Sequence, residues 1–296
     1  MSGPSQTSSP AAIPVEEKFA MVEGRRLRYL RAGSGPPLVL IHGLMGYSFS
    51  WRFNIPVFAE KRTVYAIDLL GAGYSDRPGN LDCSLTATAK RLLQLLDELH
   101  ISVFDLLGTS HGGAVAMVLA AIAGKRVRSL ILSDPVNPWS SHGRLITKIL
   151  GSAAGSALTL RLGPHMARTH NFFLRRLYGD TRRIAPGTLD GYSAAIAVPG
   201  TFEYLAKIMR CWHADLDHLH EIFPAIRHLP TLLIWGSLDA AVFPESAQEL
   251  RKKFDHCQLV IFEGVGHLPY EEVPDDFNRV VLQFLDSQPK AAASSS

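Results

Sequence analysis

Cysteine is scarce in this sequence. Only Cys83, Cys211 and Cys257 occur, an odd number at wide spacings. A disulfide framework needs cysteines that pair, and a zinc site needs closely spaced cysteines and histidines, so we predict neither a disulfide scaffold nor a metal site. Sparse thiols are typical of a reducing compartment, and we therefore expect a cytoplasmic protein.

A strong charge of one sign is also missing. The formal net charge is +3, and Lys and Arg are scattered apart from short pairs such as Arg175-Arg176 and Arg182-Arg183. A nucleic-acid-binding face needs clustered basic residues, so we interpret these pairs as solvated surface and expect no nucleic-acid partner.

The sequence lacks a secretory signal and a convincing membrane span. Its start, MSGPSQTSSPAAIP, has no basic stretch followed by an apolar one. The apolar stretch at residues 104–124 contains Ser110, His111 and four glycines, and globular patterns continue on both sides. We therefore expect no membrane span. We interpret residues 1–14 and 289–296 as disordered ends.

What the sequence does contain is an alternation of short apolar runs and helical patterns. Six runs are apolar on both faces, as parallel strands covered by helices are: PPLVLIHG, TVYAIDL, FDLLGTS, RSLILSD, LPTLLIWG and CQLVIFEG. Helical patterns such as TATAKRLLQLLDELH and ESAQELRKKF lie between them, and PDDFNRVVLQFLDS closes the chain. The alternation predicts an α/β fold with a mostly parallel, doubly wound sheet. Two further strands, joined by a turn at Glu23-Gly24, precede it.

The alternation stops between Asp134 and Leu229. Nearly a hundred residues pass there without a strand pattern, and they include helical pieces such as HGRLITKILGSAAGSALTL and NFFLRRLYG. Ligands of open α/β sheets bind beyond the carboxyl ends of the strands, so an insertion that leaves a strand end would cover that site. We predict a core from residues 15–134 and 230–288 and a helical cap from residues 135–229.

The stretch LLGTSHGGAVAM places a serine between a strand and a helix. Residues 108–112 read G-x-S-x-G, and in this context the pattern predicts a nucleophile elbow with Ser110 at its tip. Small neighbours leave room for the tight turn, and the start of the helix favours a developing negative charge. The alternative is a glycine-rich turn with an incidental serine.

A nucleophilic serine needs a base, and the base needs an orienting acid. His267 follows the last strand in FEGVGHLPYEEVP, and Asp239 follows the strand before it in LLIWGSLDAAVF. Taken singly, these residues fit a loop histidine and a helix cap. Because all three residues follow strands of one parallel sheet, we predict a triad of Ser110, His267 and Asp239 at one edge.

The chain resembles the α/β-hydrolase superfamily, in its cap-bearing branch of small esterases and related hydrolases. The resemblance covers about residues 15–286 and rests on LIHGLMG, AIDLLGAGYSDRP, LLGTSHGG, LLIWGSLD and GVGHLPYEEVP. It implies an oxyanion hole formed by the backbone N–H groups of Leu44 and His111, with His42 holding the first loop.

Several assignments stay open at this stage. His111 lies beside the nucleophile and is a rival base, although we expect it to be a polar anchor under the loops. Asp134, after the strand RSLILSD, is a rival acid, and we favour Asp239. Trp51, Trp139 and Trp212 fit either a pocket lining or core packing.

The predicted function is hydrolysis of a carboxylic ester through an acyl-enzyme, with no cofactor. A carbon–carbon bond hydrolase for ring-cleavage products is an alternative, although such relatives typically have tryptophan where this chain has Leu268. A cofactor-free perhydrolase and a triad-bearing ligand receptor also remain open. Haloalkane dehalogenases and epoxide hydrolases are disfavoured because they have aspartate at the position of Ser110. We expect a small acyl substrate as partner; the oligomeric state is open.

Overall fold

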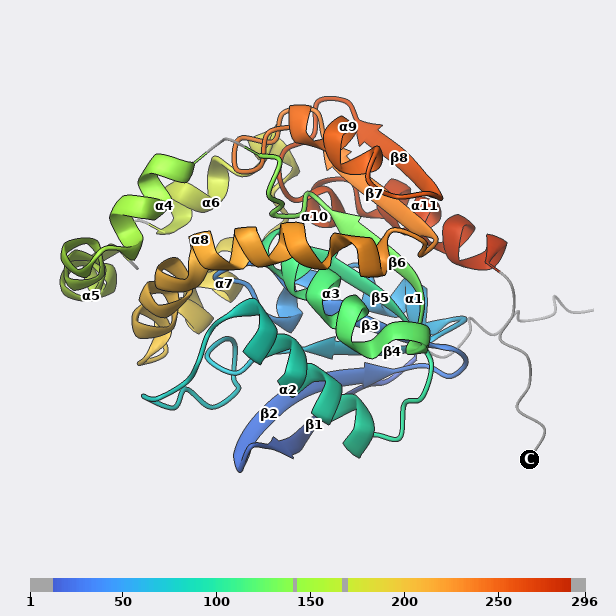
Figure 1. The fold of residues 1–296 in the computed structure, drawn as a ribbon, viewed down its shortest axis with the longest axis horizontal. Coiled ribbons are helices and arrows are strands. Elements are labelled where there is room, and N and C mark those ends of the chain that lie inside the picture. Colours follow the sequence, from blue (N-terminus) through green and yellow to red (C-terminus); the bar gives the residue numbers. More distant parts are fainter. Residues whose placement is uncertain (1–12, 141–142, 167–169, 289–296) are drawn as a thin grey trace, which may run out of the picture.

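An eight-stranded, mostly parallel sheet forms the centre of the protein (Figure 1). The computed structural model describes residues 13–140, 143–166 and 170–288. The strands are β1 (Val15–Val22), β2 (Arg25–Ala32), β3 (Pro37–Ile41), β4 (Thr63–Ile67), β5 (Phe104–Thr109), β6 (Val127–Ser133), β7 (Thr231–Gly236) and β8 (Cys257–Phe262). Their order is β1-β2-β4-β3-β5-β6-β7-β8, and every pairing from β4 to β8 is parallel. The predicted fold class is confirmed.

Helices cover both faces of this sheet. They are α1 (Ile55–Ala59), α2 (Leu85–Glu98), α3 (Ser110–Ala123), α9 (Glu245–Arg251), α10 (Pro269–Glu272) and α11 (Pro274–Ser287), with short turns η1 (Ser48–Trp51) and η2 (Gly124–Arg126). One apolar core lies under α2, α3 and α9, and a second lies under α1 and α11. The central strands β5, β6 and β7 are therefore almost entirely buried.

The edge strands differ from this pattern. β8 has no fully buried residue, and two of its residues are exposed, so the expectation that all six runs are apolar on both faces and covered is wrong for the last one. At the other edge β1 and β2 form an antiparallel hairpin. Glu23 and Gly24 have φ values of 50° and 70°, the left-handed pair that a tight hairpin turn requires. The predicted turn is confirmed.

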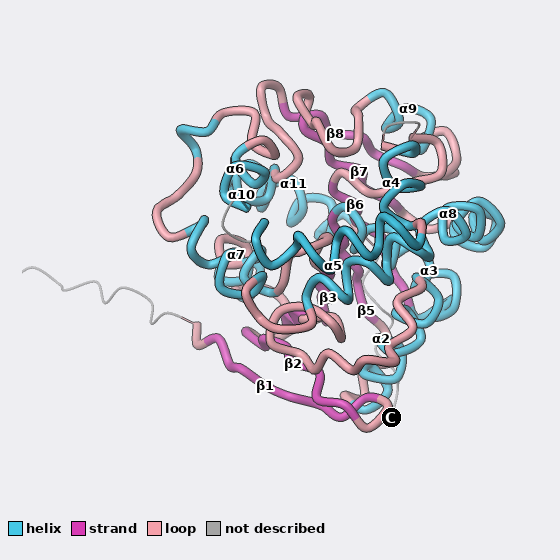
Figure 2. The backbone as a smooth tube through the Cα atoms, turned by 90° about the vertical axis from the view of Figure 1, so that its left-hand side faces the viewer, coloured by secondary structure: helices cyan, strands magenta, loops and turns pink. Residues whose placement is uncertain are grey.

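Helices fill the long interval between β6 and β7. They are α4 (Arg144–Gly151), α5 (Ala153–Met166), α6 (His170–Arg175), η3 (Thr181–Arg183), α7 (Thr188–Ile196) and α8 (Thr201–Ile226). The predicted helical stretch divides at Ser152, which has an extended ψ of 161°. α8 packs against α3 of the core and against α4 and α5, so it joins the insertion to the sheet (Figures 1 and 2). The domain boundaries at residues 134 and 230 stay a prediction.

Within the described residues, none of the helices has the length and apolar character needed to cross a membrane.

Candidate active site

Ser110 lies at a strained turn between β5 and α3. Its φ is 53°, a left-handed value that a residue with a side chain seldom adopts. The residue before it is extended and the residue after it is helical, so the chain reverses within one residue. This is the geometry of the predicted nucleophile elbow, and it puts the serine at the carboxyl end of the central strand.

Two glycines make this turn possible. A Cβ atom on Gly112 would lie 2.2 Å from the carbonyl oxygen of His42, and one on Gly108 would lie 2.5 Å from the carbonyl oxygen of Gly112. Backbone atoms cannot yield to such contacts. The glycines of the motif therefore let α3 lie directly against the ends of β3 and β5.

The loop after β3 touches the serine. A Cβ atom on Gly43 would lie 3.0 Å from the Cβ of Ser110, and Met45 has a left-handed φ of 61°. The Leu44 N–H has no hydrogen-bond acceptor in the described part of the chain. The N–H of His111 belongs to the first turn of α3, where backbone donors lack helical partners. Both groups are available to an oxyanion.

His267 and Asp239 are brought into direct contact. The histidine Nδ1 lies 2.8 Å from the aspartate Oδ2, and both side chains are buried. The aspartate Oδ1 also accepts the N–H groups of Ala241 and Val242, at 2.7 and 3.0 Å. A carboxylate only accepts hydrogen bonds, so Nδ1 carries the hydrogen and Nε2 is left as a base.

Asp134, the rival acid, lies next to this pair. It has no exposed surface, and its φ is 47°. Its carboxyl accepts the Gly236 N–H at 2.9 Å and the Ser133 hydroxyl at 2.8 Å. Burial, and then the Asp239 carboxylate, raise the pKa of Asp134 well above its usual value. This shift favours the protonated form of the Asp134 carboxyl group over the charged form.

A metal-ligand geometry exists only at this same place within the described residues. One ligand atom each from Asp134, Asp239 and His267 lie within 4.8 Å of one another. The prediction that the protein needs no metal stays a prediction.

The His267 loop is fastened to the inserted helices through Glu272. This buried carboxylate accepts the N–H groups of Gly179 at 3.0 Å, Asp180 at 2.9 Å and Gly266 at 2.9 Å, and it pairs with Arg183 at 3.1 Å. Sequence reasoning missed this role. The only available signal was the second of the two adjacent glutamates in the motif GVGHLPYEEVP.

Glu271 makes the neighbouring connection. It accepts two hydrogen bonds from Arg52, at 2.8 and 3.0 Å, and further ones from the hydroxyl groups of Tyr178, at 2.6 Å, and Tyr192. Arg52 follows η1 in the core, whereas both tyrosines belong to the insertion. Two buried glutamates thus hold core and insertion together beside the histidine.

His42 anchors the loop after β3. Its Nδ1 donates to the carbonyl oxygen of Gly43 at 2.8 Å, and its Nε2 accepts the N–H of Leu69 at 3.1 Å. Burial lowers the pKa of His42, which keeps the ring neutral. These bonds agree with the loop-holding role that the resemblance implied.

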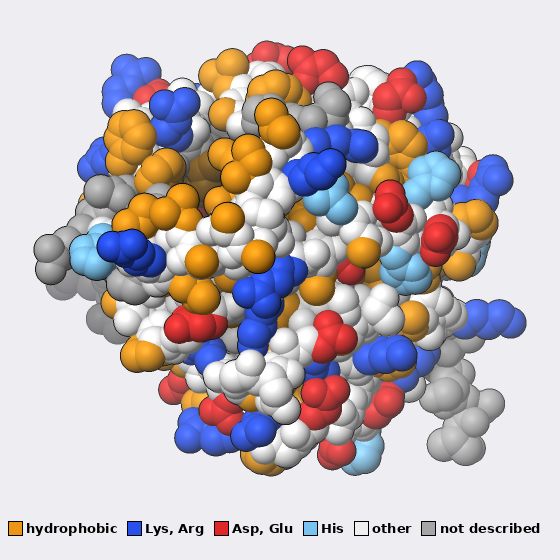
Figure 3. All heavy atoms as spheres, turned by 60° about the vertical axis from the view of Figure 1, so that its left-hand side comes forward, with side chains coloured by type: hydrophobic (Ala, Val, Ile, Leu, Met, Phe, Trp, Pro, Cys, Tyr) orange, Lys and Arg blue, Asp and Glu red, His pale blue; other side chains and the backbone are white. Residues whose placement is uncertain are grey.

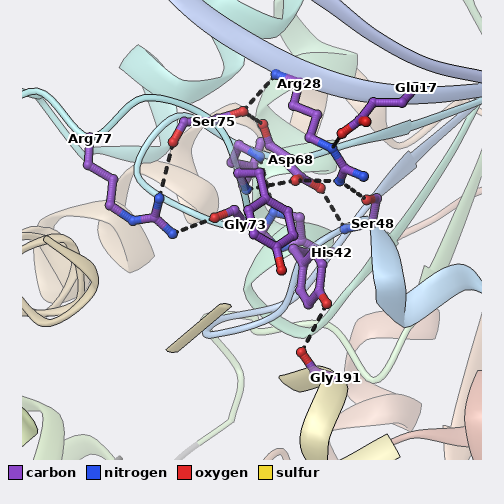
Figure 4. Close-up of polar contacts among 12 residues, drawn as sticks. Glu17, Arg28, His42, Ser48, Asp68, Gly73, Ser75, Arg77 and Gly191 are labelled. Atoms are coloured by element: carbon purple, nitrogen blue, oxygen red, sulfur yellow. Dashed lines mark hydrogen bonds and ion pairs between the residues drawn. The ribbon is translucent and has the colours of Figure 1, made fainter. Parts of the chain in front are cut away.

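Asp68 organises the next loop (Figure 4). Its carboxylate accepts the Ser48 N–H at 2.7 Å and the Tyr74 N–H at 2.9 Å, and it pairs with Arg28 at 2.9 Å. A Cβ atom on Gly73 would lie 2.3 Å from the same carboxylate. Asp68 is therefore a structural residue beneath the site.

His111 lies under the insertion. Its ring stacks on Trp212 of α8 with centroids 6.0 Å apart, and its Nε2 is buried without a hydrogen-bond partner among the described residues. Burial, with a smaller effect from His42, lowers the pKa of His111 to about 4. The ring is thus an anchor through stacking. Of the other tryptophans, Trp51 is core, with no exposed surface.

The comparisons with known proteins identify the family of this chain. The chain matches the family described as alpha/beta hydrolase fold over residues 36–274. The chain belongs to this family. This α/β-hydrolase is therefore an enzyme, as its sequence predicted.

Its relatives differ in what they are named for. The chain is 29% identical over 289 residues to the dihydrolipoyllysine-residue acetyltransferase component of an acetoin cleaving system from Pseudomonas putida, covering 96% of this chain and 71% of that protein. It is 28% identical over 296 residues to a 2-hydroxymuconate semialdehyde hydrolase from a Pseudomonas species, covering 97% and 100%. The crystal structure of a mutant meta-cleavage product hydrolase has a TM-score of 0.76 at 26% identity, covering 91% and 97%.

Proposed function

We propose that this α/β-hydrolase is a serine hydrolase that cleaves carboxylic esters through an acyl-enzyme. Ser110 is the nucleophile, His267 the general base and Asp239 the orienting acid. The observation that carries this proposal is the buried 2.8 Å contact between His267 and Asp239 at the sheet edge where Ser110 takes its left-handed φ. A base held by a carboxylate, at the same strand ends as a serine on an elbow, is the arrangement expected to activate a hydroxyl.

The reaction follows from this arrangement. Ser110 Oγ attacks the acyl carbon while His267 Nε2 takes its proton, and the Leu44 and His111 N–H groups stabilise the oxyanion. The imidazolium then gives its proton to the leaving alcohol, which leaves an acyl-serine. Water attacks this ester with His267 again as base, which releases the carboxylic acid and restores the serine.

The insertion serves as the cap in this proposal. The Glu271 and Glu272 contacts tie it to the histidine loop, and α8 brings Trp212 against the residue after the nucleophile. The cap therefore limits what reaches Ser110. Residues 135–229 are its proposed extent.

A screen of p-nitrophenyl esters of increasing acyl length tests the ester proposal. We expect steady turnover by the isolated protein, with one preferred chain length set by the cap. Turnover without a partner would also exclude the receptor alternative. Absence of hydrolysis at every length, in a protein that still folds, would contradict the proposal.

A carbon–carbon bond hydrolase is the second candidate, and the similarity to a 2-hydroxymuconate semialdehyde hydrolase along the whole of that relative favours it. The buried Leu268 after the histidine departs from the tryptophan typical of such enzymes. Incubation with 2-hydroxymuconate semialdehyde separates the two candidates. Its cleavage is measured as a loss of the absorbance of this compound. Faster turnover of that compound than of any ester would make the second candidate the function.

A further inference from the structure

The inserted helices have a charge unlike the rest of the molecule. Residues 135–179 contain six Lys or Arg and no Asp or Glu. The whole chain carries a formal net charge of +3, so this segment carries +6 and everything else carries −3. The positive charge of the protein is thus concentrated in residues 135–179, the part of the sequence that contains α4, α5 and α6.

The same helices expose large apolar side chains. Six of these residues are 48–74% exposed. They are Leu145, Ile146 and Ile149 of α4, Leu158 of α5, and Phe172 and Phe173 of α6. The other sides of α4 and α5 pack against α8, where a Cβ atom on Gly151 would meet the carbonyl oxygen of Met209 at 2.4 Å. The exposed apolar residues are therefore not turned toward the core.

Basic side chains lie among these apolar ones. Lys148, Arg161, Arg175 and Arg176 are exposed, and none has an ion-pair partner in the residues that the structure describes. The guanidinium of Arg176 lies 5.8 Å from the ring centroid of Phe172. Figure 3, which brings this side of the molecule forward, shows hydrophobic side chains gathered around a hollow, with Lys and Arg around them. We call this the α4–α6 surface.

We propose that the α4–α6 surface binds a lipid bilayer that contains anionic lipids. Helices that lie in a membrane interface combine exposed Leu, Ile and Phe with Lys and Arg on their polar side, and unpaired basic residues are attracted to anionic headgroups. A contiguous exposed apolar patch of this kind also marks an interaction site in a folded protein. A second copy of the chain fits less well, because a symmetric contact would oppose two surfaces of the same positive charge.

This binding would bring the hollow against the bilayer. Lipophilic esters dissolved in the membrane would then reach the enzyme without passing through water. The binding itself does not depend on the proposed chemistry, so Ser110→Ala should bind vesicles as the wild-type protein does. Loss of hydrolysis and loss of membrane binding are separate results.

Sedimentation with unilamellar vesicles tests the proposal. The probes are vesicles of phosphatidylcholine alone and of phosphatidylcholine mixed with phosphatidylglycerol. We expect binding to the mixed vesicles that weakens as salt is added. Each basic residue near an anionic membrane contributes about fivefold in partitioning, so Arg175→Gln with Arg176→Gln should weaken binding by about 25-fold.

A matched control separates this surface from the overall charge. Lys90→Gln with Lys125→Gln removes the same charge from exposed positions on α2 and η2 and should leave binding unchanged. Leu145→Ser with Ile146→Ser removes exposed apolar groups and should weaken binding with all charges kept. Thermal unfolding confirms that each variant is folded.

Three results would overturn the proposal. One is the absence of wild-type binding to mixed vesicles at low salt. Another is an equal loss of binding in the Lys90 and Lys125 control. The third is a wild-type dimer in solution that the Leu145 and Ile146 variant converts to a monomer, because the surface would then be covered by a second copy.

Discussion

The ends of β6 and β7 present the same residue type in two different states. Asp134 and Asp239 both follow a strand of the parallel sheet, and their carboxyl groups are neighbours. Asp239 accepts hydrogen bonds from two backbone N–H groups and from the His267 imidazole, so both of its oxygens act as acceptors. Asp134 is fully buried beside that carboxylate, and its pKa is raised well above the usual value. Two charges cannot be kept so close in a buried site.

This difference shows that a strand end fixes where a residue lies but not its charge. The charge of a carboxyl group depends on how many hydrogen-bond donors face it and on whether a neighbouring carboxyl group is already ionised. For the triad, we therefore propose that the acid after β7 orients the imidazole and stabilises its cation. The raised pKa of the acid after β6 favours its protonated form.

The largest expected effect tests whether the carboxyl ends of the strands around Ser110 form the catalytic site. Ser110→Ala removes the proposed nucleophile with little change in volume. We expect a loss of ester turnover of about 10⁶-fold, since removing the nucleophile of such a triad costs about that much. A fluorophosphonate probe should label the wild-type protein at Ser110 and not label the variant. Labelling of another serine would place the reaction elsewhere.

Exchanging the acids one at a time tests the comparison itself. Asp239→Asn favours the wrong imidazole tautomer, and we expect kcat to fall by about 10⁴-fold. Asp134→Asn replaces a carboxyl group whose raised pKa favours the protonated form by an amide of similar size, and we expect a change of less than about tenfold. Both are measured as ester turnover at neutral pH. A crippled Asp134→Asn with an active Asp239→Asn would move the acid to β6.

The loop after β8, which carries His267, offers a further contrast because contacts with the inserted helices support it. Glu272→Gln presents an amide to the three backbone N–H groups that the carboxylate accepts and removes its pairing with Arg183. Breaking a buried charge network of this kind should lower the free energy of unfolding by about 3–5 kcal/mol, measured by urea denaturation.

The exposed pair Glu249–Lys252 supplies the control for that measurement. Glu249→Gln should change stability by less than about 1 kcal/mol, because surface ion pairs contribute little. Equal effects of the two substitutions would show that Glu272 does not fasten the histidine loop.

The sequence was sufficient to predict the architecture and the candidate triad because both depend on local signals. A strand followed by G-x-S-x-G and a helix defines the elbow at Ser110, and Asp239 and His267 each follow a recognisable apolar run. The parallel sheet then brings these ends to one edge. No comparable signal exists for Glu272, whose partners lie about ninety residues earlier in the chain.

Charge states and exposure were out of reach for a different reason. The raised pKa of Asp134 depends on burial and on the Asp239 carboxylate, which lies 105 residues away in the chain. The absence of acidic residues from 135 to 179 was visible, yet only the packing of α4 on α8 reveals which side chains are exposed. Scattered Arg and Lys in the sequence become one surface after folding.

The smallest effect concerns the two histidines at this edge of the sheet. The base that takes the Ser110 proton must be neutral, so kcat/KM should rise with pH and then level off. His111 has its pKa lowered to about 4, so it is already neutral wherever the enzyme is folded and active. It adds no second step to the rise.

We therefore expect a one-proton limb in the wild-type protein and an unchanged limb in His111→Gln. The comparison is a kcat/KM profile of both proteins from about pH 5 to 9 on one ester. The variant should lose some stability, because its amide cannot stack on Trp212 as the ring does. A limb that disappears in His111→Gln, with Ser110 still labelled by the fluorophosphonate, would make His111 the base and leave His267 without its proposed role.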